Sequence, residues 1–368
     1  LPDGMIYLDG NSLGPLPKAA AARVAHAVTE EWGKLLITGW NKAGWMDKPM
    51  QVGDRIARLI GAEPDHVVMG DTLSIKVYQA LASCLEMNPT RKVILSDTGN
   101  FPSDLYMAEG LCRTLGDGYT LKIVAPEEVL DAIDDTVAVT MITEVDYRTG
   151  RRHDMAAITA RAHEQGALTV WDLAHSAGAI PVDLSGADAD FAVGCSYKYL
   201  NGGPGAPAFV WVHPRHASRF WQPLSGWWGH AAPFAFTPDY QPAPGITRYL
   251  CGTQPIISLS ALQCGLDVFT AAQSLGGMAA LRAKSLALTD LFIQLVEERC
   301  AGHGLGLATP REHAQRGSQV CLTRDEGAGV NGQGSGAYAI VQALIARGVI
   351  GDFRKGDGGK GPHKDILR

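Results

Sequence analysis

Short apolar runs alternate with amphipathic segments along the first 212 residues, and this alternation limits the fold more than any other feature of the sequence. The segments between the runs, at 74–85, 103–111 and 155–166, have the periodicity of helices. Strands that are apolar along their whole length are typical of parallel or mixed sheets covered on both faces. The sequence therefore predicts an α/β fold with a mixed, mostly parallel sheet between helices. The expected strands lie at 66–70, 92–96, 121–124, 137–142, 167–171, 191–196 and 206–212.

The chain outside this block divides into segments of different character. Two helices are expected between residues 18 and 61. Residues 213–255 are rich in proline and aromatic residues and have little periodicity, and so long an irregular stretch is uncommon unless it has a function. One long helical pattern covers 256–301, and a short strand and a helix at 337–347 follow. We expect an N-terminal segment, a large domain, and a long linking helix with a small, incomplete α+β C-terminal domain, at 1–45, 46–260 and 261–368.

Charge and composition exclude several classes of protein. The net charge is −6 and no basic run interrupts the mixture, so neither a nucleic-acid surface nor a membrane surface is expected. No apolar run reaches the ~18 residues of a membrane span, and the first residues lack the pattern of a secretory leader. The seven cysteines form no Cys-x-x-Cys pair, and their odd number cannot pair completely. We therefore expect free thiols, no metal site and a cytoplasmic location.

One glycine cluster imitates a nucleotide-binding motif. The segment GAGVNG at 327–332 matches G-x-G-x-x-G, but about a dozen residues separate the preceding strand from the following helix. A dinucleotide site needs these glycines on a tight turn of a few residues between strand and helix. We interpret the cluster as a surface loop.

The strongest chemical signal is an acid and a lysine after two neighbouring strands. Asp172 ends the strand at 167–171, and Lys198 follows the strand at 191–196 and precedes a glycine-rich turn. The carboxyl ends of parallel strands meet at one crevice, so both side chains can converge there. A lysine that forms a Schiff base and an acid that holds a pyridine nitrogen protonated are what pyridoxal phosphate chemistry needs. The simpler interpretation is a surface lysine and a helix-capping aspartate.

Two further segments fit the same chemistry. Ser74 lies at a strand-to-helix junction, where free N–H groups and the helix dipole favour a phosphate, although an ordinary N-cap is the simpler interpretation. Phe101 lies in a turn and can cover the face of a flat ring. Asp104, next to it, is either a polar contact of the ring or an N-cap.

Seven motifs then follow one another in an order that resembles kynureninase, a fold-type I pyridoxal phosphate enzyme. They span nearly the whole chain, and together they are far more specific than any one of them. They are YLDGNSLGPLP (7–17), EEWG with GWNKAGW (30–45), NFPSDLY (100–106), WDLAHSAGA (171–179), YKYLNGGPG (197–205), PLSGWWGH (223–230) and YLCGTQP (249–255).

The resemblance implies the activity of that family: hydrolysis of the Cβ–Cγ bond of L-kynurenine to anthranilate and L-alanine in tryptophan catabolism, with 3-hydroxykynurenine as a second candidate substrate. It also implies Lys198 as the Schiff-base lysine, Asp172 as the partner of the pyridine nitrogen, and Tyr197 as a phosphate ligand. The reaction needs a base for the α proton, which we expect to be Lys198, and an acid. We expect the acid to be Tyr197, next to Lys198 in the sequence, with phosphate binding alone as the alternative. The other implied cofactor contacts are Leu73, Ser74, Phe101, Pro102, Ser103, Asp104, Thr143 and His175.

The resemblance further implies a homodimer with shared active sites. Trp227 and Thr253 are expected to reach the phosphate from the neighbouring subunit, which gives the irregular stretch 213–255 a function. Trp40 is expected to line the pocket of the aromatic substrate. Arg368 matches the arginine that binds the substrate carboxylate, although KGDGGKGPHK before it departs from the family pattern.

Three further functions stay open at this point. The first, a cysteine desulfurase, needs a mobile catalytic cysteine in a C-terminal loop, and no cysteine follows Cys321. The second is an aminotransferase, and the third is an inactive cofactor-binding dimer. A Ser/His/Asp hydrolase built on Asp172, His175 and Ser176 lacks a nucleophile elbow, and the three residues are too close in sequence for a triad.

Overall fold

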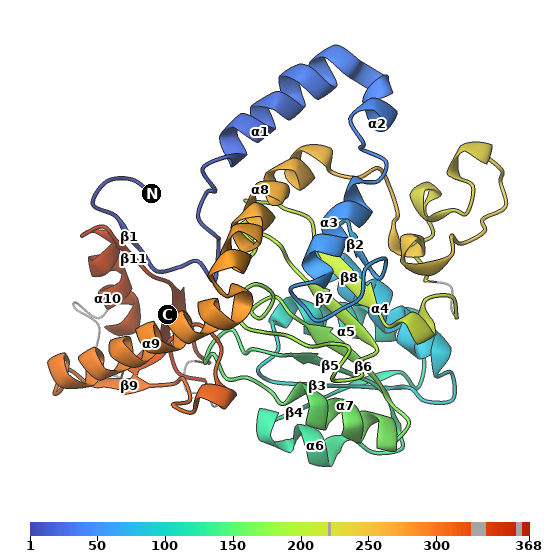
Figure 1. Cartoon of the computed structure of the whole chain (residues 1–368). Helices are drawn as coiled ribbons and strands as arrows, with labels where there is room; N and C mark the ends of the chain where they lie inside the picture. The colour runs from blue at the N-terminus through green and yellow to red at the C-terminus, as the bar shows by residue number, and fades with distance from the viewer. Residues whose placement is uncertain (220–221, 325–335, 358–362) are drawn as a thin grey trace.

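The computed structural model describes residues 1–219, 222–324, 336–357 and 363–368. The glycine cluster at 327–332 lies outside these residues. Figure 1 shows a large α/β part, a smaller part around α9 and α10, and the segment that follows β8 projecting from the large part.

A seven-stranded mixed sheet forms the centre of the large part, in the order β2-β8-β7-β6-β5-β3-β4. Neighbouring strands from β4 to β7 pair in parallel, whereas β8 is antiparallel to both β7 and β2. Six strands therefore share one direction, which confirms the predicted mixed, mostly parallel sheet. The strands are β2 (Val67–Met69), β3 (Val93–Asp97), β4 (Thr120–Val124), β5 (Val137–Thr143), β6 (Leu168–Asp172), β7 (Phe191–Gly194) and β8 (Phe209–Val212).

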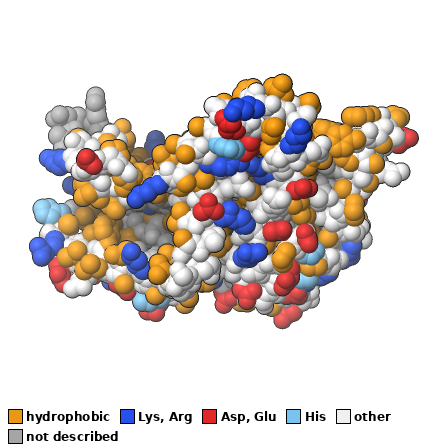
Figure 2. Space-filling view, turned by 45° about the horizontal axis from the view of Figure 1, so that its top comes forward, with side chains coloured by type: hydrophobic (Ala, Val, Ile, Leu, Met, Phe, Trp, Pro, Cys, Tyr) orange, Lys and Arg blue, Asp and Glu red, His pale blue; other side chains and the backbone are white. Residues whose placement is uncertain are grey.

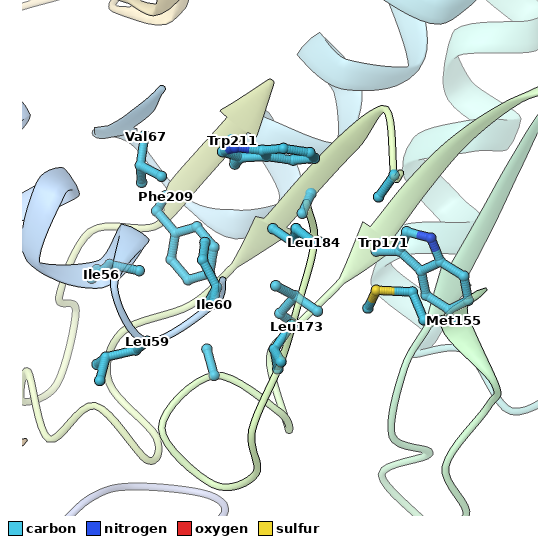
Figure 3. Packing of buried hydrophobic residues seen from close by; sticks show 14 of the residues in the cluster. Ile56, Leu59, Ile60, Val67, Met155, Trp171, Leu173, Leu184, Phe209 and Trp211 are labelled. Atoms are coloured by element: carbon cyan, nitrogen blue, oxygen red, sulfur yellow. The ribbon is translucent and has the colours of Figure 1, made fainter. Parts of the chain in front are cut away.

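Helices cover both faces of this sheet. Successive residues of a strand point to opposite faces, so each strand contributes side chains to two cores. Val170 and Val210 join a core with the helices α4 and α5, whereas Trp171 and Trp211 join the opposite core, shown in Figure 3. Since both faces are buried, the strands read as continuous apolar runs in the sequence. The covering helices are α3 (Lys48–Ala57), α4 (Leu73–Met87), α5 (Pro102–Leu115), α6 (Val129–Ala132) and α7 (Met155–Glu164), with the 3₁₀ turn η3 (Pro126–Glu128) before α6.

The helical stretch expected at 256–301 is two helices rather than one. Helix α8 (Ile256–Ala272) continues as a 3₁₀ turn, η8 (Gln273–Leu275), and α9 (Gly277–Arg299) follows. Gly276 and Gly277 take φ values of 99° and 59°, a left-handed conformation that ends the first helix. The apolar periodicity continues across the break, which is why the sequence suggested one helix.

The stretch Ile256–Leu275 is long and apolar enough, by length and composition, to cross a membrane, with a mean hydropathy of 1.2. The sequence did not suggest this length because polar residues such as Gln263 and Asp267 interrupt the apolar ones. In the structure, Leu259, Leu262 and Leu266 are buried, and the helix packs against α1 and α3.

The smaller part combines the C-terminal residues with the start of the chain. Four short strands pair antiparallel in the order β12-β13-β10-β9, and the helix α10 (Gly336–Ile345) packs on them. At the side of this sheet, β1 (Ile6–Tyr7) pairs in parallel with β11 (Val349–Ile350). The four strands are β9 (Leu305–Leu307), β10 (Leu322–Arg324), β12 (Phe353–Arg354) and β13 (Ile366–Leu367), and the 3₁₀ turn η9 (His313–Gln315) lies between β9 and β10.

Two segments leave large apolar side chains exposed. After α1 (Ala20–His26) come a π-helical stretch, η1 (Ala27–Leu35), a 3₁₀ turn, η2 (Leu36–Thr38), and α2 (Gly39–Lys42); Ile37 on η2 is 77% exposed. The described part of 213–255 contains 3₁₀ turns and an isolated antiparallel bridge between His230 and Pro242, and its Phe236 is 78% exposed. Figure 2 shows hydrophobic side chains on this projecting segment. Its turns are η4 (Pro214–His216), η5 (Trp227–Gly229), η6 (Pro233–Ala235) and η7 (Gly245–Tyr249).

Candidate active site

The predicted site residues gather where the parallel strands end. Asp172 is the last residue of β6 and Thr143 the last of β5, while Lys198 follows β7. Phe101 lies between β3 and α5 as the N-cap of α5, and Leu73 follows β2 and begins α4. Because these strands share a direction, their carboxyl ends form one edge, which is where open α/β sheets bind ligands.

Asp172 is a buried acid and does not cap a helix. Its Oδ1 accepts from the backbone N–H of Ala174 at 2.9 Å, and its Oδ2 accepts from the hydroxyl of Thr143 at 3.4 Å. Burial raises the pKa of Asp172, and the nearby Lys198 opposes that rise. The acid thus has remaining hydrogen-bonding capacity beside a cation, which suits a partner that carries a proton on nitrogen.

Asp104 lies beside Asp172 with both carboxyl oxygens buried, and the two carboxyl groups hydrogen-bond to each other. The oxygens of Asp104 have no other partner among the described residues. Burial, and then the charge of Asp172, raise the pKa of Asp104 well above its usual range. The residue is not an N-cap, because Phe101 holds that position of α5. Buried polar groups are usually hydrogen-bonded in folded proteins, so the remaining capacity of these oxygens indicates a site for a ligand.

Lys198 reaches the same edge from the other side. Its Nζ lies 2.9 Å from Nε2 of His175 and 5.8 Å from the ring centres of Phe101 and Tyr197. Burial and the charge of Lys198 hold the pKa of His175 well below its usual range, so the imidazole is neutral. Burial raises the pKa of the Tyr197 phenol, which stays protonated at neutral pH.

The first turns of α4 and α5 meet through two hydroxyl groups. Oγ of Ser74 lies 2.8 Å from Oγ of Ser103, so the two helix starts lie side by side. The N-cap of α4 is Thr72, which excludes the simple capping role for Ser74; Pro102 is the first residue of α5. Two helix N-termini with adjacent hydroxyls are a suitable place for a phosphate group.

A buried polar network, which the sequence did not reveal, lies beneath this place. Lys76 on α4 is fully buried, and its Nζ donates to Asp71 at 2.9 Å, to Gln79 at 3.0 Å and to the carbonyl of Tyr249 at 2.7 Å. Gln79 in turn donates to Gln222 at 3.1 Å. The network joins the start of α4 to the irregular segment that carries Trp227 and Thr253.

The side chain of Arg368 is held by residues near the start, in the middle and near the end of the chain. It donates to Ser12 at 2.7 Å, to Asp352 at 2.5 Å and to the carbonyl of Tyr147 at 2.8 Å, and its side chain is 1% exposed. Its charge is among those that lower the pKa of His175, so the guanidinium lies near the edge of the sheet.

Two of the remaining predicted residues, Trp40 and Trp227, lie in an aromatic cluster. The ring of Trp40 lies 5.0 Å from that of Trp228, which lies 4.5 Å from that of Trp227. Trp227 is 39% exposed, and Thr253 is exposed as well. The described contacts of these residues within one chain therefore do not include the lysine.

The edge as a whole fits pyridoxal phosphate. It offers an amine for the cofactor carbonyl, a buried acid for the ring nitrogen, a second buried carboxyl group, an aromatic ring and two helix N-termini for the phosphate. Within the described residues no group of His, Cys, Asp and Glu side chains is arranged to hold a metal ion, and all seven cysteines are free thiols.

Comparisons with known proteins agree with this fit. The chain is 57% identical to the kynureninase of Pseudomonas fluorescens and 56% identical to that of Burkholderia mallei strain SAVP1, in each case over 96% of this chain and 83% of the relative. The sequence profile of the kynureninase C-terminal domain matches residues 281–359.

Solved structures show the same fold at low sequence identity. A C-DES variant with glycine covalently linked to its PLP cofactor has a TM-score of 0.79 and 16% identity, covering 99% of this chain and 91% of that one. The cysteine desulfurase of Thermococcus onnurineus NA1 has a TM-score of 0.75 and 17% identity, with coverages of 99% and 88%. Taken with the identity to the curated relatives, these findings show that the chain belongs to the kynureninase family, whose cofactor is pyridoxal phosphate.

Proposed function

We propose that the protein cleaves the Cβ–Cγ bond of L-kynurenine with one water molecule, releasing anthranilate and L-alanine, and that the residues gathered at the sheet edge perform this reaction. The observation that carries the proposal is the convergence of Lys198, Asp172 and the buried Asp104 in a chain so similar to named kynureninases. Family membership supports the activity, whereas the role of each residue rests on the geometry above.

Each residue at the edge is assigned to a different part of the cofactor. Lys198 is the attachment point, Asp172 holds the ring nitrogen, and Phe101 covers a ring face. His175, Thr143 and Asp104 supply polar contacts around the ring. When bound, pyridoxal phosphate supplies an electron-accepting ring that stabilises negative charge on the substrate carbons. The phosphate contacts are the backbone N–H of Leu73, the first turn of α5 at Pro102, and the side chains of Ser74, Ser103 and Tyr197.

Substrate handling falls to four residues of this chain. Arg368 grips the α-carboxylate with its planar guanidinium, which suits a bidentate pair. Lys198 Nζ takes the proton from the α carbon, and the protonated phenol of Tyr197 supplies a proton later in the reaction. Trp40 lines the space for the aromatic ring.

The active unit in this proposal is a homodimer with shared sites. Trp227 and Thr253 are exposed on an irregular segment with several exposed aromatic side chains, which favours contact with a second copy. From there they reach the phosphate of the neighbouring subunit. The free thiols support a reducing compartment, the cytoplasm.

The test combines a spectrum with a fluorescence assay. The purified protein with added pyridoxal phosphate is expected to show a visible absorbance band and to release fluorescent anthranilate from L-kynurenine. Lys198→Ala is expected to abolish both, while Lys34→Ala, at an exposed lysine on η1, leaves them unchanged. A band without anthranilate would leave an aminotransferase, a cysteine desulfurase or an inactive cofactor-binding dimer, and the absence of a band would refute all four. Parallel turnover of 3-hydroxykynurenine decides which substrate is preferred.

A further inference from the structure

Gln319 connects the smaller part of the molecule to the histidine that faces Lys198. It lies shortly before β10, is 6% exposed, and comes from a part of the chain where the sequence showed no signal. Its Oε1 lies 3.1 Å from Nδ1 of His175. Its Nε2 donates to the carbonyls of Asp146 and Tyr147, both at 3.1 Å.

The hydrogen-bond partners of the Gln319 side-chain amide determine its orientation, and that orientation determines which nitrogen of His175 carries the proton. Backbone carbonyls can only accept, so the NH₂ group of Gln319 must face Asp146 and Tyr147, and its oxygen must face His175. An amide oxygen also only accepts, so Nδ1 of His175 must carry hydrogen. A neutral imidazole has one N–H, which leaves a lone pair on Nε2, 2.9 Å from Nζ of Lys198.

We propose that Gln319 is a positioning residue that holds His175 in the Nδ1–H tautomer, so that Nε2 accepts from the amine of Lys198 and orients it. The proposal rests on the proposed function for the role of Lys198, but the tautomer itself does not. Without Gln319, the imidazole is free to place its hydrogen on Nε2 and can then no longer accept from Lys198.

The same contact links the amine to the substrate side of the site. The carbonyl of Tyr147 accepts from Gln319 at 3.1 Å and from Arg368 at 2.8 Å. The proposed carboxylate-binding group therefore binds the carbonyl of Tyr147 directly, and the proposed base is linked to the same carbonyl through His175 and Gln319. The low pKa of His175 supports the proposal, because a neutral ring is the state in which the choice of tautomer matters.

The direct test is ¹⁵N NMR of histidine side chains in the loaded enzyme, with the His175 signals identified by their loss in His175→Asn. The wild type and Gln294→Leu, a control at an exposed glutamine of α9, are expected to show hydrogen on Nδ1. Gln319→Leu is expected to move it to Nε2 or to give a mixture. Gln319→Glu keeps an acceptor toward Nδ1 and, in its protonated form, a donor toward the carbonyls of Asp146 and Tyr147, and it is expected to restore the Nδ1–H form.

Kinetics provide the second measurement. Gln319→Leu is expected to lower kcat for L-kynurenine about tenfold, the scale of one hydrogen bond in a site, with little change in KM. Retention of the Nδ1–H form in Gln319→Leu overturns the proposal, whatever the activity. Loss of that form in a protein that never releases anthranilate upholds the tautomer and refutes the proposed function, so the two failures can be told apart.

Discussion

At the scale of single residues, the site is built from groups whose protonation is set by burial. Asp104 and Asp172 lie together with raised pKa values, Tyr197 stays a neutral phenol, and His175 stays a neutral imidazole. Groups with shifted pKa values cluster at functional sites, because burial there makes the charged form of each group unfavourable unless a partner stabilises it. The phenol of Tyr197 and the buried carboxyl group of Asp104 can each be tested by a single substitution.

The phenol of Tyr197 is expected to act as an acid and not only as a phosphate ligand. Tyr197→Phe is then expected to lower kcat by about a hundredfold, the lower range for a lost acid–base group, while the cofactor's visible band remains. Rapid-quench measurement of the first turnover separates the roles. An unchanged burst of anthranilate in the variant would rule out the catalytic role and leave phosphate binding.

Asp104 is expected to lower the stability of the folded, cofactor-free protein at neutral pH. Its pKa is raised in the folded state, so its contribution to stability is present below the pKa of the unfolded chain and is lost as the pH rises. Asp104→Asn is expected to raise the free energy of unfolding of the cofactor-free protein by about 1–3 kcal/mol at pH 7 and much less at pH 4. Urea titrations at both pH values measure this.

The same variant is expected to bind pyridoxal phosphate more weakly, because the carboxyl group of Asp104, which bonds within the chain to Asp172, has remaining hydrogen-bonding capacity for the ligand. Cofactor titration followed by absorbance tests that half of the prediction. The prediction is contradicted if Asp104→Asn has the same free energy of unfolding as the wild type at both pH values and binds the cofactor with the same affinity.

At the scale of elements, the sequence predicted most of what positions the site. The buried strands stood out because both of their faces are covered, and the residues at their ends followed from the shared strand direction. The break between α8 and α9 was missed because Gly276 interrupts the backbone without interrupting the apolar pattern. Gln319 and Lys76 were missed for a different reason. Their roles depend on contacts with residues far away in the chain, and a single sequence does not record such contacts.

Lys76 is expected to hold the phosphate end of the site in shape. Its ammonium group ties Asp71, which has a left-handed φ of 53°, and the carbonyl of Tyr249 to the first turns of α4. Lys76→Met removes the cation from the half-buried Asp71 and leaves the carbonyl of Tyr249 with Gln79 as its donor. Removing one partner of a fully buried charge pair costs about 3–5 kcal/mol, so the cost here is smaller.

The variant should therefore lose affinity for pyridoxal phosphate at least tenfold. Its affinity for pyridoxal, which lacks the phosphate, should change much less. Lys34→Met, at an exposed lysine, is the control. Equal losses for the two ligands would indicate general destabilisation instead of a distorted phosphate site, and circular dichroism shows whether the fold is retained.

At the scale of the whole molecule, the exposed aromatic segment and the residues proposed to cross the interface predict complementation between variants. Lys198→Ala and Thr253→Ala damage different halves of a shared site. Mixing the two should create dimers in which one site carries both changes and the other carries neither, so about a quarter of the sites are intact at random pairing. Activity well above that of either parent, rising as subunits exchange, supports shared sites. A mixture no more active than its parents contradicts them.

The division at 1–45, 46–260 and 261–368 stays a prediction at this scale, although the strand pairing of β1 with β11 ties the start of the chain to the smaller part. The resemblance placed Arg368 in the site in spite of the unusual residues before it. The anchors of Arg368, at Ser12, Asp352 and Tyr147, could not be read from the sequence because they come from three distant segments.

The anchors of Arg368 have a consequence for the order in which the sites form during synthesis on the ribosome. The central sheet is complete once residue 212 has emerged, but the contact between Ser12 and Arg368 joins residues 356 positions apart. At usual rates of synthesis the two events are separated by roughly 8–30 s. During that interval the nascent chain holds the edge that receives the cofactor and lacks the guanidinium that receives the substrate. Cofactor loading can thus precede substrate binding in the life of every molecule.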